Sequence, residues 1–126
     1  MTTELYYNDF LNRLVSIYEP REAANITEWV FENVTGLKRL QIELQKNAEL
    51  KIEYVAKMED YLKKLLQHKP VQYVLNEAWF YKMKFYVNEH VLIPRPETEE
   101  LVGWAVRDIK NYKMKDEIKL LDMGTG

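Results

Sequence analysis

Glycine is nearly missing from most of this 126-residue sequence: Gly36 is the only one before Gly103. Because glycine supplies many sharp turns and bulges, its scarcity favours helices joined by short connections. Apolar residues recur at i, i+3, i+4 and i+7 and predict helices over residues 3–18, 21–35, 37–45 and 49–68. Gly36 suits the left-handed position after the second helix.

The predicted inward residues of the first two helices are Tyr7, Phe10, Leu11, Leu14, Ile17 and Tyr18, then Ala23, Ile26, Val30 and Val34. The other face of the fourth helix carries interspersed charges of both signs, so a solvated face is favoured there over a binding patch.

The pattern changes at Pro70, after which β-branched and aromatic residues dominate. Residues 77–81 and 85–88 flank Lys82-Met83-Lys84 and predict a β-hairpin. Residues 97–112 return to helical spacing, with Leu101, Val102, Ala105 and Ile109 inward and Pro96 at the start. Residues 118–122 predict a buried strand.

The expected fold class is mainly α. A helical bundle (residues 1–68) is followed by a β-hairpin linker (69–94) and by the first helix and strand of a Rossmann-like α/β domain (95–126).

Composition excludes several classes of function. The net charge of −2 gives no general attraction to nucleic acid or anionic membranes. The absence of cysteine excludes disulfides and thiolate chemistry. The acidic, polar start is not a signal peptide, and no apolar run approaches the length of a membrane span. We therefore expect a cytoplasmic protein without a membrane partner.

The first candidate site is the stretch "LLDMGTG", in which a predicted strand delivers Asp122 and then two glycines. Glycine lets a backbone approach a nucleotide closely, so Gly124, Thr125 and Gly126 are candidate cofactor-binding residues. A plain surface turn after the strand is the alternative reading of so short a motif.

The second candidate is "VLIPRPETEELV", residues 91–102. Pro94 and Pro96 restrict the backbone on both sides of Arg95 and favour an extended loop. Glu97 and Thr98 follow at a helix start. Arg95, Pro96, Glu97 and Thr98 are therefore candidates for the vicinity of a substrate or cofactor. The alternative is a rigid linker whose polar residues only complete the helix terminus.

Other candidates are weaker. The two histidines, His68 and His90, lack the spacing of metal ligands, so no metal site is predicted. Trp29, Trp79 and Trp104 are expected in the core or partly buried. Residues 79–81 have an alternative role as a wall near a substrate entrance.

Together, residues 69–102 and "LLDMGTG" resemble the HemK/PrmC family of protein-glutamine methyltransferases. The most diagnostic piece, Pro-Arg-Pro-Glu-Thr, is intact at residues 94–98. Asn76 stands where family members usually have glycine, and Lys82-Met83-Lys84 replaces a glycine-containing turn. Both departures concern the geometry of the hairpin.

The resemblance implies N5-methylation of the glutamine in the Gly-Gly-Gln loop of class-1 peptide chain release factors, with S-adenosylmethionine as methyl donor. It also implies that the helical domain docks the release factor. The family's catalytic Asn-Pro-Pro-Tyr loop does not occur in these 126 residues, so no catalytic residue is assigned. We expect an N-terminal fragment that is inactive alone and that self-associates through the exposed strand.

Two alternatives remain open from the sequence. One is an adenine-N6 methyltransferase acting on DNA or RNA, since an exocyclic amine poses the same chemical problem as an amide nitrogen. A helical bundle without a basic face makes nucleic acid an unfavoured partner. The other is a non-enzymatic helical module that binds protein. The residues that follow this sequence in the reading frame would discriminate, because both enzyme readings require Asn-Pro-Pro-Tyr there.

Overall fold

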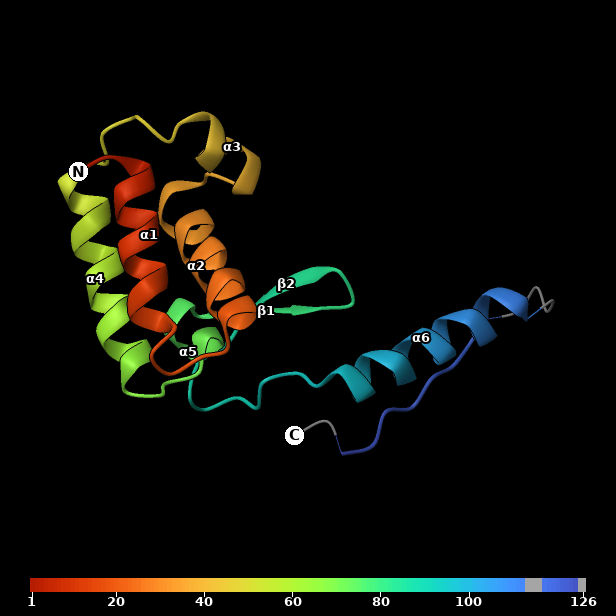
Figure 1. The fold of residues 1–126 in the computed structure, drawn as a ribbon. Coiled ribbons are helices and arrows are strands. Elements are labelled where there is room, and N and C mark those ends of the chain that lie inside the picture. Colours follow the sequence, from red (N-terminus) through yellow and green to blue (C-terminus); the bar gives the residue numbers. More distant parts are fainter. Residues whose placement is uncertain (113–116, 125–126) are drawn as a thin grey trace.

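The structure is a computed structural model that describes residues 1–112 and 117–124. Its elements follow the predicted order of a helical bundle, a β-hairpin and one further helix (Figure 1). They are α1 (Thr3–Leu14), α2 (Pro20–Thr35), α3 (Arg39–Leu44), α4 (Ile52–Leu66), α5 (Val71–Leu75), β1 (Glu77–Phe80), β2 (Met83–Tyr86) and α6 (Pro96–Asn111). The mainly α layout is therefore confirmed.

Helices α1, α2 and α4 pack side by side around one hydrophobic core, with α3 across one end (Figure 1). The ring of Phe31 lies at its centre, close to three other aromatic rings from α1. The fully buried core side chains include Phe10, Leu14, Val30, Phe31, Met58, Leu62 and Leu65. Helical spacing of apolar residues is what brings them onto facing surfaces.

The helix ends deviate from the prediction for identifiable reasons. Helix α1 ends at Leu14 because the amides of Ile17 and Tyr18 both donate to the Leu14 carbonyl, which turns the chain. Helix α4 begins at Ile52 because Thr2 and Glu49 form an isolated antiparallel bridge just before it. Gly36 has φ of 75°, which confirms the predicted left-handed cap of α2.

Helix α5 was not predicted, because its sequence "VQYVL" has the β-branched and aromatic character of a strand. Val74 and Leu75 are only 4% and 5% exposed and belong to the core cluster of the bundle. Burial of these two side chains outweighs the weak local preference for an extended chain.

The core membership of α5 gives a prediction for isolated fragments. We expect residues 1–76 to unfold cooperatively, and residues 1–68 to be less stable by about 3 kcal/mol, the value of two buried apolar side chains. Thermal unfolding of both fragments, followed by circular dichroism, measures the difference. A non-cooperative transition of residues 1–76 would show that the bundle depends on later segments.

The β-hairpin is confirmed, with Glu77 opposite Tyr86 and Phe80 opposite Met83. The turn lies at Tyr81 and Lys82, one residue earlier than the predicted Lys82-Met83-Lys84, and φ is 50° and 59° at these two residues. Two positive φ values are typical of the tight turns that join twisted strands. Asn76, which precedes β1, has φ of 55°, so asparagine replaces glycine at a position where it is tolerated.

The turn gives a second prediction. Replacing Lys82 by glycine should stabilise the hairpin by about 0.5–1 kcal/mol, because a side chain at positive φ is strained. Hydrogen exchange of the Phe85 and Val87 amides should slow accordingly. The matched control is Met83→Gly within β2, which should speed exchange. Faster exchange in Lys82→Gly would contradict the argument.

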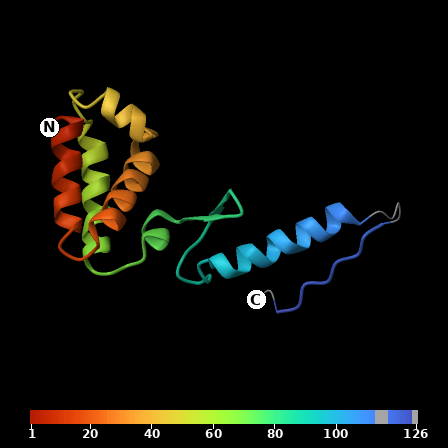
Figure 2. The same cartoon turned by 45° about the vertical axis from the view of Figure 1, so that its right-hand side comes forward.

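Helix α6 extends away from the bundle (Figure 2), and none of its residues is buried. Leu101 is 60% exposed and Ile109 is 39% exposed, so the predicted inward face is wrong for this chain. The amphipathic pattern is present, but no element of the described residues covers that face.

The predicted strand at residues 118–122 is also wrong, since residues 117–124 form no strand in the structure. Leu120 and Leu121 are 66% and 83% exposed. A strand needs a neighbouring backbone to complete its hydrogen bonds, and none is paired with it within residues 1–112 and 117–124. Self-association through this segment stays a prediction.

Arg13 of α1 and Glu59 of α4 form the main polar link inside the bundle. Arg13 donates to both carboxylate oxygens of Glu59, at 2.8 and 3.1 Å, and the Tyr6 hydroxyl donates to one of them at 2.9 Å. Burial alone would raise the pKa of Glu59, but the hydrogen bonds from Arg13 and Tyr6 outweigh burial and lower it below 4.5.

The lowered pKa of Glu59 makes stability depend on pH. A carboxyl with a lowered pKa in the folded state stabilises the fold above its unfolded pKa, and this is lost as pH falls through the folded pKa. At neutral pH, Glu59→Gln should lose about 1 kcal/mol, because the pair is partly exposed. The deficit should shrink between about pH 5 and pH 3 in urea unfolding. Glu53→Gln, at an exposed position on α4, is the control; a deficit that is independent of pH would contradict the assignment.

Candidate functional site

The two motif stretches line one open hollow of about 640 Å³. Helix α6 carries the chain outward and residues 117–124 return along it, so the stretches approach each other (Figure 2). The lining residues are His90, Val91, Leu92, Ile93, Pro94, Arg95, Thr98, Asp122 and Gly124. Two segments separated in sequence by most of α6 thus share one surface.

Arg95 has the extended backbone that its flanking prolines predict, with φ of −98° and ψ of 148°. Its carbonyl accepts the amides of Thr98 and Glu99 at 3.1 and 3.2 Å, and Pro96 occupies the first turn of α6. The predicted site residues Arg95 and Thr98 line the hollow, whereas Pro96 and Glu97 do not. Their roles toward a ligand stay predictions.

Gly124 has φ of 80°, a left-handed conformation that favours glycine. A Cβ built there would meet nothing within 4 Å, so conformation rather than crowding explains the glycine. Thr125 and Gly126, the other candidate cofactor-binding residues, lie outside the described residues.

The chemistry of the hollow is that of a binding wall. Its cation is the guanidinium of Arg95, its acid is the carboxylate of Asp122, and its hydroxyl belongs to Thr98. These groups can hydrogen-bond a polar ligand but do not form a nucleophile with an adjacent base. Within residues 1–112 and 117–124, no group of three or more His, Asp or Glu side chains is arranged to hold a metal ion.

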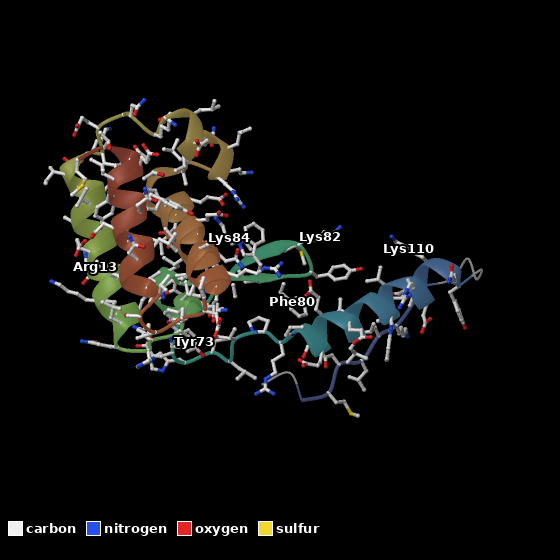
Figure 3. All side chains as sticks on the ribbon, in the orientation of Figure 1. Arg13, Tyr73, Phe80, Lys82, Lys84 and Lys110 are labelled. Carbon is white, nitrogen blue, oxygen red and sulfur yellow. The ribbon has the colours of Figure 1, made fainter. Side chains whose placement is uncertain are left out.

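Two residues that hold these stretches in place, Tyr73 and Glu99, were not predicted from the sequence. The Tyr73 hydroxyl, labelled in Figure 3, donates to the carbonyl of Val91 ahead of the proline stretch. Glu99 accepts the amide N–H of Tyr81 at 2.7 Å and ties the first turn of α6 to the hairpin turn. Nothing in the local sequence indicates this contact, because its two partners lie eighteen positions apart.

The tryptophans are placed differently from one another. Trp29 is partly buried, as expected, and its indole N–H donates to Glu77 at 3.0 Å. Trp79 and Trp104 are 56% and 53% exposed, so their predicted burial is wrong. Residues 79–81 do not line the hollow of the motif stretches. The histidines are both exposed, and His90 lies at the edge of that hollow.

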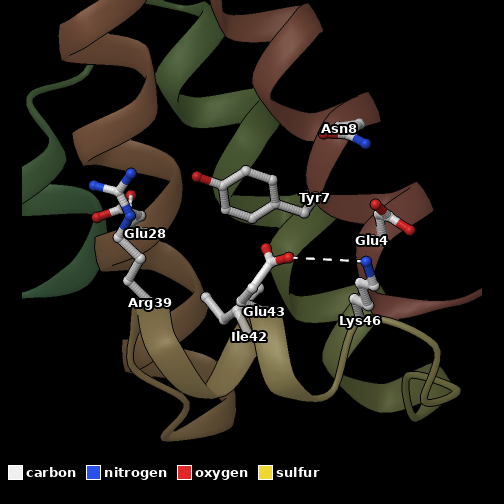
Figure 4. A pocket seen from close by; sticks show the side chains of 8 residues that line it. All are labelled: Glu4, Tyr7, Asn8, Glu28, Arg39, Ile42, Glu43 and Lys46. Carbon is white, nitrogen blue, oxygen red and sulfur yellow. Dashed lines mark ion pairs between the residues drawn. The ribbon is translucent and has the colours of Figure 1, made fainter.

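A smaller hollow of about 200 Å³ lies on the bundle among α1, α2 and α3 (Figure 4). Arg39 lies 3.4 Å from a carboxylate oxygen of Glu28, and Lys46 lies 3.9 Å from one of Glu43. Burial, and then the charge of Glu28, raises the pKa of Tyr7 between them. With Glu4 as a third acid, this surface does not favour a phosphate backbone.

None of the helices that the structure describes is long and apolar enough to cross a bilayer.

Comparison with known proteins identifies the family. A family model described as the PrmC N-terminal domain matches residues 7–75. A release factor glutamine methyltransferase of Flavobacterium psychrophilum is 36% identical over all 126 residues, which cover 44% of that protein. A Chlorobaculum tepidum protein of the same name is 38% identical over 87% of this chain and 37% of its own length.

A third relative, from Bacillus anthracis, carries the same name and is 32% identical over 81% of this chain and 36% of its own length. The chain thus spans less than half the length of the curated relatives it matches. The resemblance drawn from residues 69–102 and 120–126 is confirmed, and the match over residues 7–75 shows that this chain belongs to the PrmC N-terminal domain family.

Proposed function

We propose that this chain is the N-terminal part of an S-adenosylmethionine-dependent enzyme that methylates the side-chain amide of the Gly-Gly-Gln glutamine in class-1 release factors. The observation that carries the proposal is the 36% identity to a release factor glutamine methyltransferase over the whole chain. The shared hollow of residues 90–95 and Thr98 with Asp122 and Gly124 supports it, because it brings together parts of both stretches that carry the family resemblance.

In this proposal the three segments have separate tasks. Residues 1–68 bind the release factor, residues 69–94 link the two parts, and residues 95–126 begin the domain that holds the donor. The mixed charges around the bundle hollow fit a protein partner better than a nucleic acid.

The residues of the larger hollow fit one wall of a donor site. Gly124, and beyond it Thr125 and Gly126, would offer backbone amides. Arg95 and Thr98 would stand near the donor or the substrate, with Pro96 and Glu97 between them in the chain. S-adenosylmethionine supplies an electrophilic methyl group on a sulfonium. This chain's own share of the work is to bind and orient.

Activity requires more than this wall. An amide nitrogen is a weak nucleophile because its lone pair is delocalised, so catalysis depends on positioning it and on accepting its hydrogens. The resemblance assigns that task to an Asn-Pro-Pro-Tyr loop, which these 126 residues do not contain. We therefore expect no methyl transfer by the 126-residue polypeptide alone.

The test is methyl transfer by the full-length protein that carries this sequence. We expect label from methyl-labelled S-adenosylmethionine on a class-1 release factor. Replacing the Gly-Gly-Gln glutamine by glutamate, which is isosteric but has no amide nitrogen, should abolish labelling. Labelling of duplex DNA instead would overturn the proposal in favour of an adenine methyltransferase, and no transfer to either would favour a non-enzymatic module.

A further inference from the structure

The carboxylate of Glu77 joins the hairpin to the helical bundle. It accepts the indole N–H of Trp29 at 3.0 Å on one oxygen and the side-chain amide of Asn33 at 2.7 Å on the other. Trp29 and Asn33 are four positions apart on α2 and so project from the same face. The Glu77 side chain is only 18% exposed, so both hydrogen bonds are shielded from water.

The contacts of Glu77 continue into two other elements. The Tyr61 hydroxyl of α4 donates to the Asn33 side-chain oxygen at 3.4 Å. Lys84 of β2 places its ammonium 3.6 Å from Glu77, and Figure 3 shows it on the hairpin next to α2. One carboxylate at the first position of β1 thereby connects α2, α4 and both strands.

Contacts next to Glu77 also hold the base of the hairpin in place. Ala78 and Val87 are each only 2% exposed, and the Asn76 side chain donates to the Val87 carbonyl at 3.0 Å. At the other end, the Tyr81 amide donates to Glu99, and the Tyr81 ring lies 3.8 Å from where a Cβ of Gly103 would stand. The chain from bundle to α6 is thus held at both ends of the hairpin.

We propose that Glu77 is a positioning residue that fixes the angle between the helical bundle and the hairpin, and through the hairpin the place of residues 94–98. This structural role stands independently of the proposed function. Its consequence for catalysis rests on the proposed function: a release factor held by the bundle must present its glutamine at a fixed distance from the donor.

The structural test uses the 126-residue chain, whose lack of cysteine allows labelling at chosen positions. Spin labels at Glu53→Cys on α4 and Met83→Cys on β2 report the distance between bundle and hairpin. Both positions are exposed. We expect Glu77→Ala to broaden the distance distribution about twofold, while thermal unfolding of the bundle stays near the wild-type value, since Trp29 and Asn33 are partly exposed and can turn to water.

Three further variants make the test specific. Glu77→Gln keeps one acceptor and should broaden the distribution less than alanine does. Lys84→Met removes the exposed cation alone and should leave the width unchanged. Asn33→Asp places a second carboxylate next to Glu77 and should broaden the distance distribution. If Glu77→Ala fails to fold, the Asn33→Asp result tests the role of Glu77 in its place. Wild-type width in a folded Glu77→Ala chain, or in Asn33→Asp, would overturn the inference.

The functional consequence has its own measurement in the full-length protein. Glu77→Ala should lower kcat/KM toward an intact release factor about tenfold or more, because small misplacements of reacting groups cost large factors in rate. Methylation of a short Gly-Gly-Gln peptide, which does not span both parts, should be unchanged. If the wild-type protein methylates neither substrate, the proposed function fails while the spin-label result still decides the role of Glu77. Equal losses on both substrates would exclude a positioning role.

Discussion

Replacing Phe31 by alanine is expected to lower the free energy of unfolding by about 3–5 kcal/mol, the usual cost of removing a buried phenylalanine. The Phe31 side chain is fully buried in α2. Its ring lies 6.1 Å from that of Tyr6, 5.3 Å from Tyr7 and 6.4 Å from Phe10. Alanine would remove the ring's apolar contacts and these aromatic pairs together, and would leave a cavity at the centre of the bundle.

So large a loss would consume most of the stability of a small domain, which is commonly about 5–15 kcal/mol. Urea unfolding followed by helical circular dichroism measures it, and the urea dependence should keep its slope if only stability changes. The matched control is Trp104→Ala on α6, where the ring is 53% exposed and the expected loss is below about 0.5 kcal/mol. Equal losses in both variants would show that the core does not centre on Phe31.

The burial of Phe31 at the centre of the core could not be predicted from the spacing of apolar residues. Helical spacing predicted every described helix except α5. It gave Phe10, Leu14, Ala23, Ile26 and Val30 as inward, and all five are buried. It did not single out Tyr6 or Phe31, which with Phe10 are the largest fully buried side chains. Periodicity defines the width of an apolar face but not its centre, which depends on the neighbouring helix.

The same limit explains the other differences. Val71–Leu75 reads as a strand locally and is a helix because Val74 and Leu75 complete the bundle core. Conversely, the spacing of apolar residues in α6 predicts a face that packs against the protein, but none of its residues is buried. Such spacing shows that a helix has an apolar face to cover, and not whether a neighbouring element covers it.

For the candidate site, the sequence indicated residues 94–98 and the loop after Leu121, and the structure places Arg95, Thr98, Asp122 and Gly124 on one hollow. It did not indicate the groups that hold them. Tyr73, Glu77 and Glu99 act through partners 18 to 48 positions away, and no spacing rule predicts such pairs. Residues that bind a ligand are often close together in the sequence and form a motif. The residues that hold such a motif in position come from distant segments and depend on the tertiary structure.

The second large effect concerns which ligand the 126 residues retain. We expect them to bind a class-1 release factor weakly while binding S-adenosylmethionine at least about a hundredfold more weakly than the full-length protein, a difference of roughly 2.7 kcal/mol. The hollow that Arg95, Thr98, Asp122 and Gly124 line is open, with Asp122 and Gly124 exposed, whereas small-ligand sites bury most of their ligand.

Calorimetric titration of the 126-residue chain and of the full-length protein with donor, release factor and duplex DNA, in separate runs, distinguishes these outcomes. Release factor binding should depend only moderately on salt, because the bundle surface pairs Arg39 with Glu28 and Lys46 with Glu43. Nucleic-acid binding would instead weaken steeply as salt rises. Micromolar donor binding by the 126 residues would contradict the open-wall argument. Tight, salt-sensitive DNA binding without a response to the release factor would contradict the proposed substrate. We do not expect such binding, because the bundle surface has three acids around two cations and therefore no positive field that would hold a polyanion.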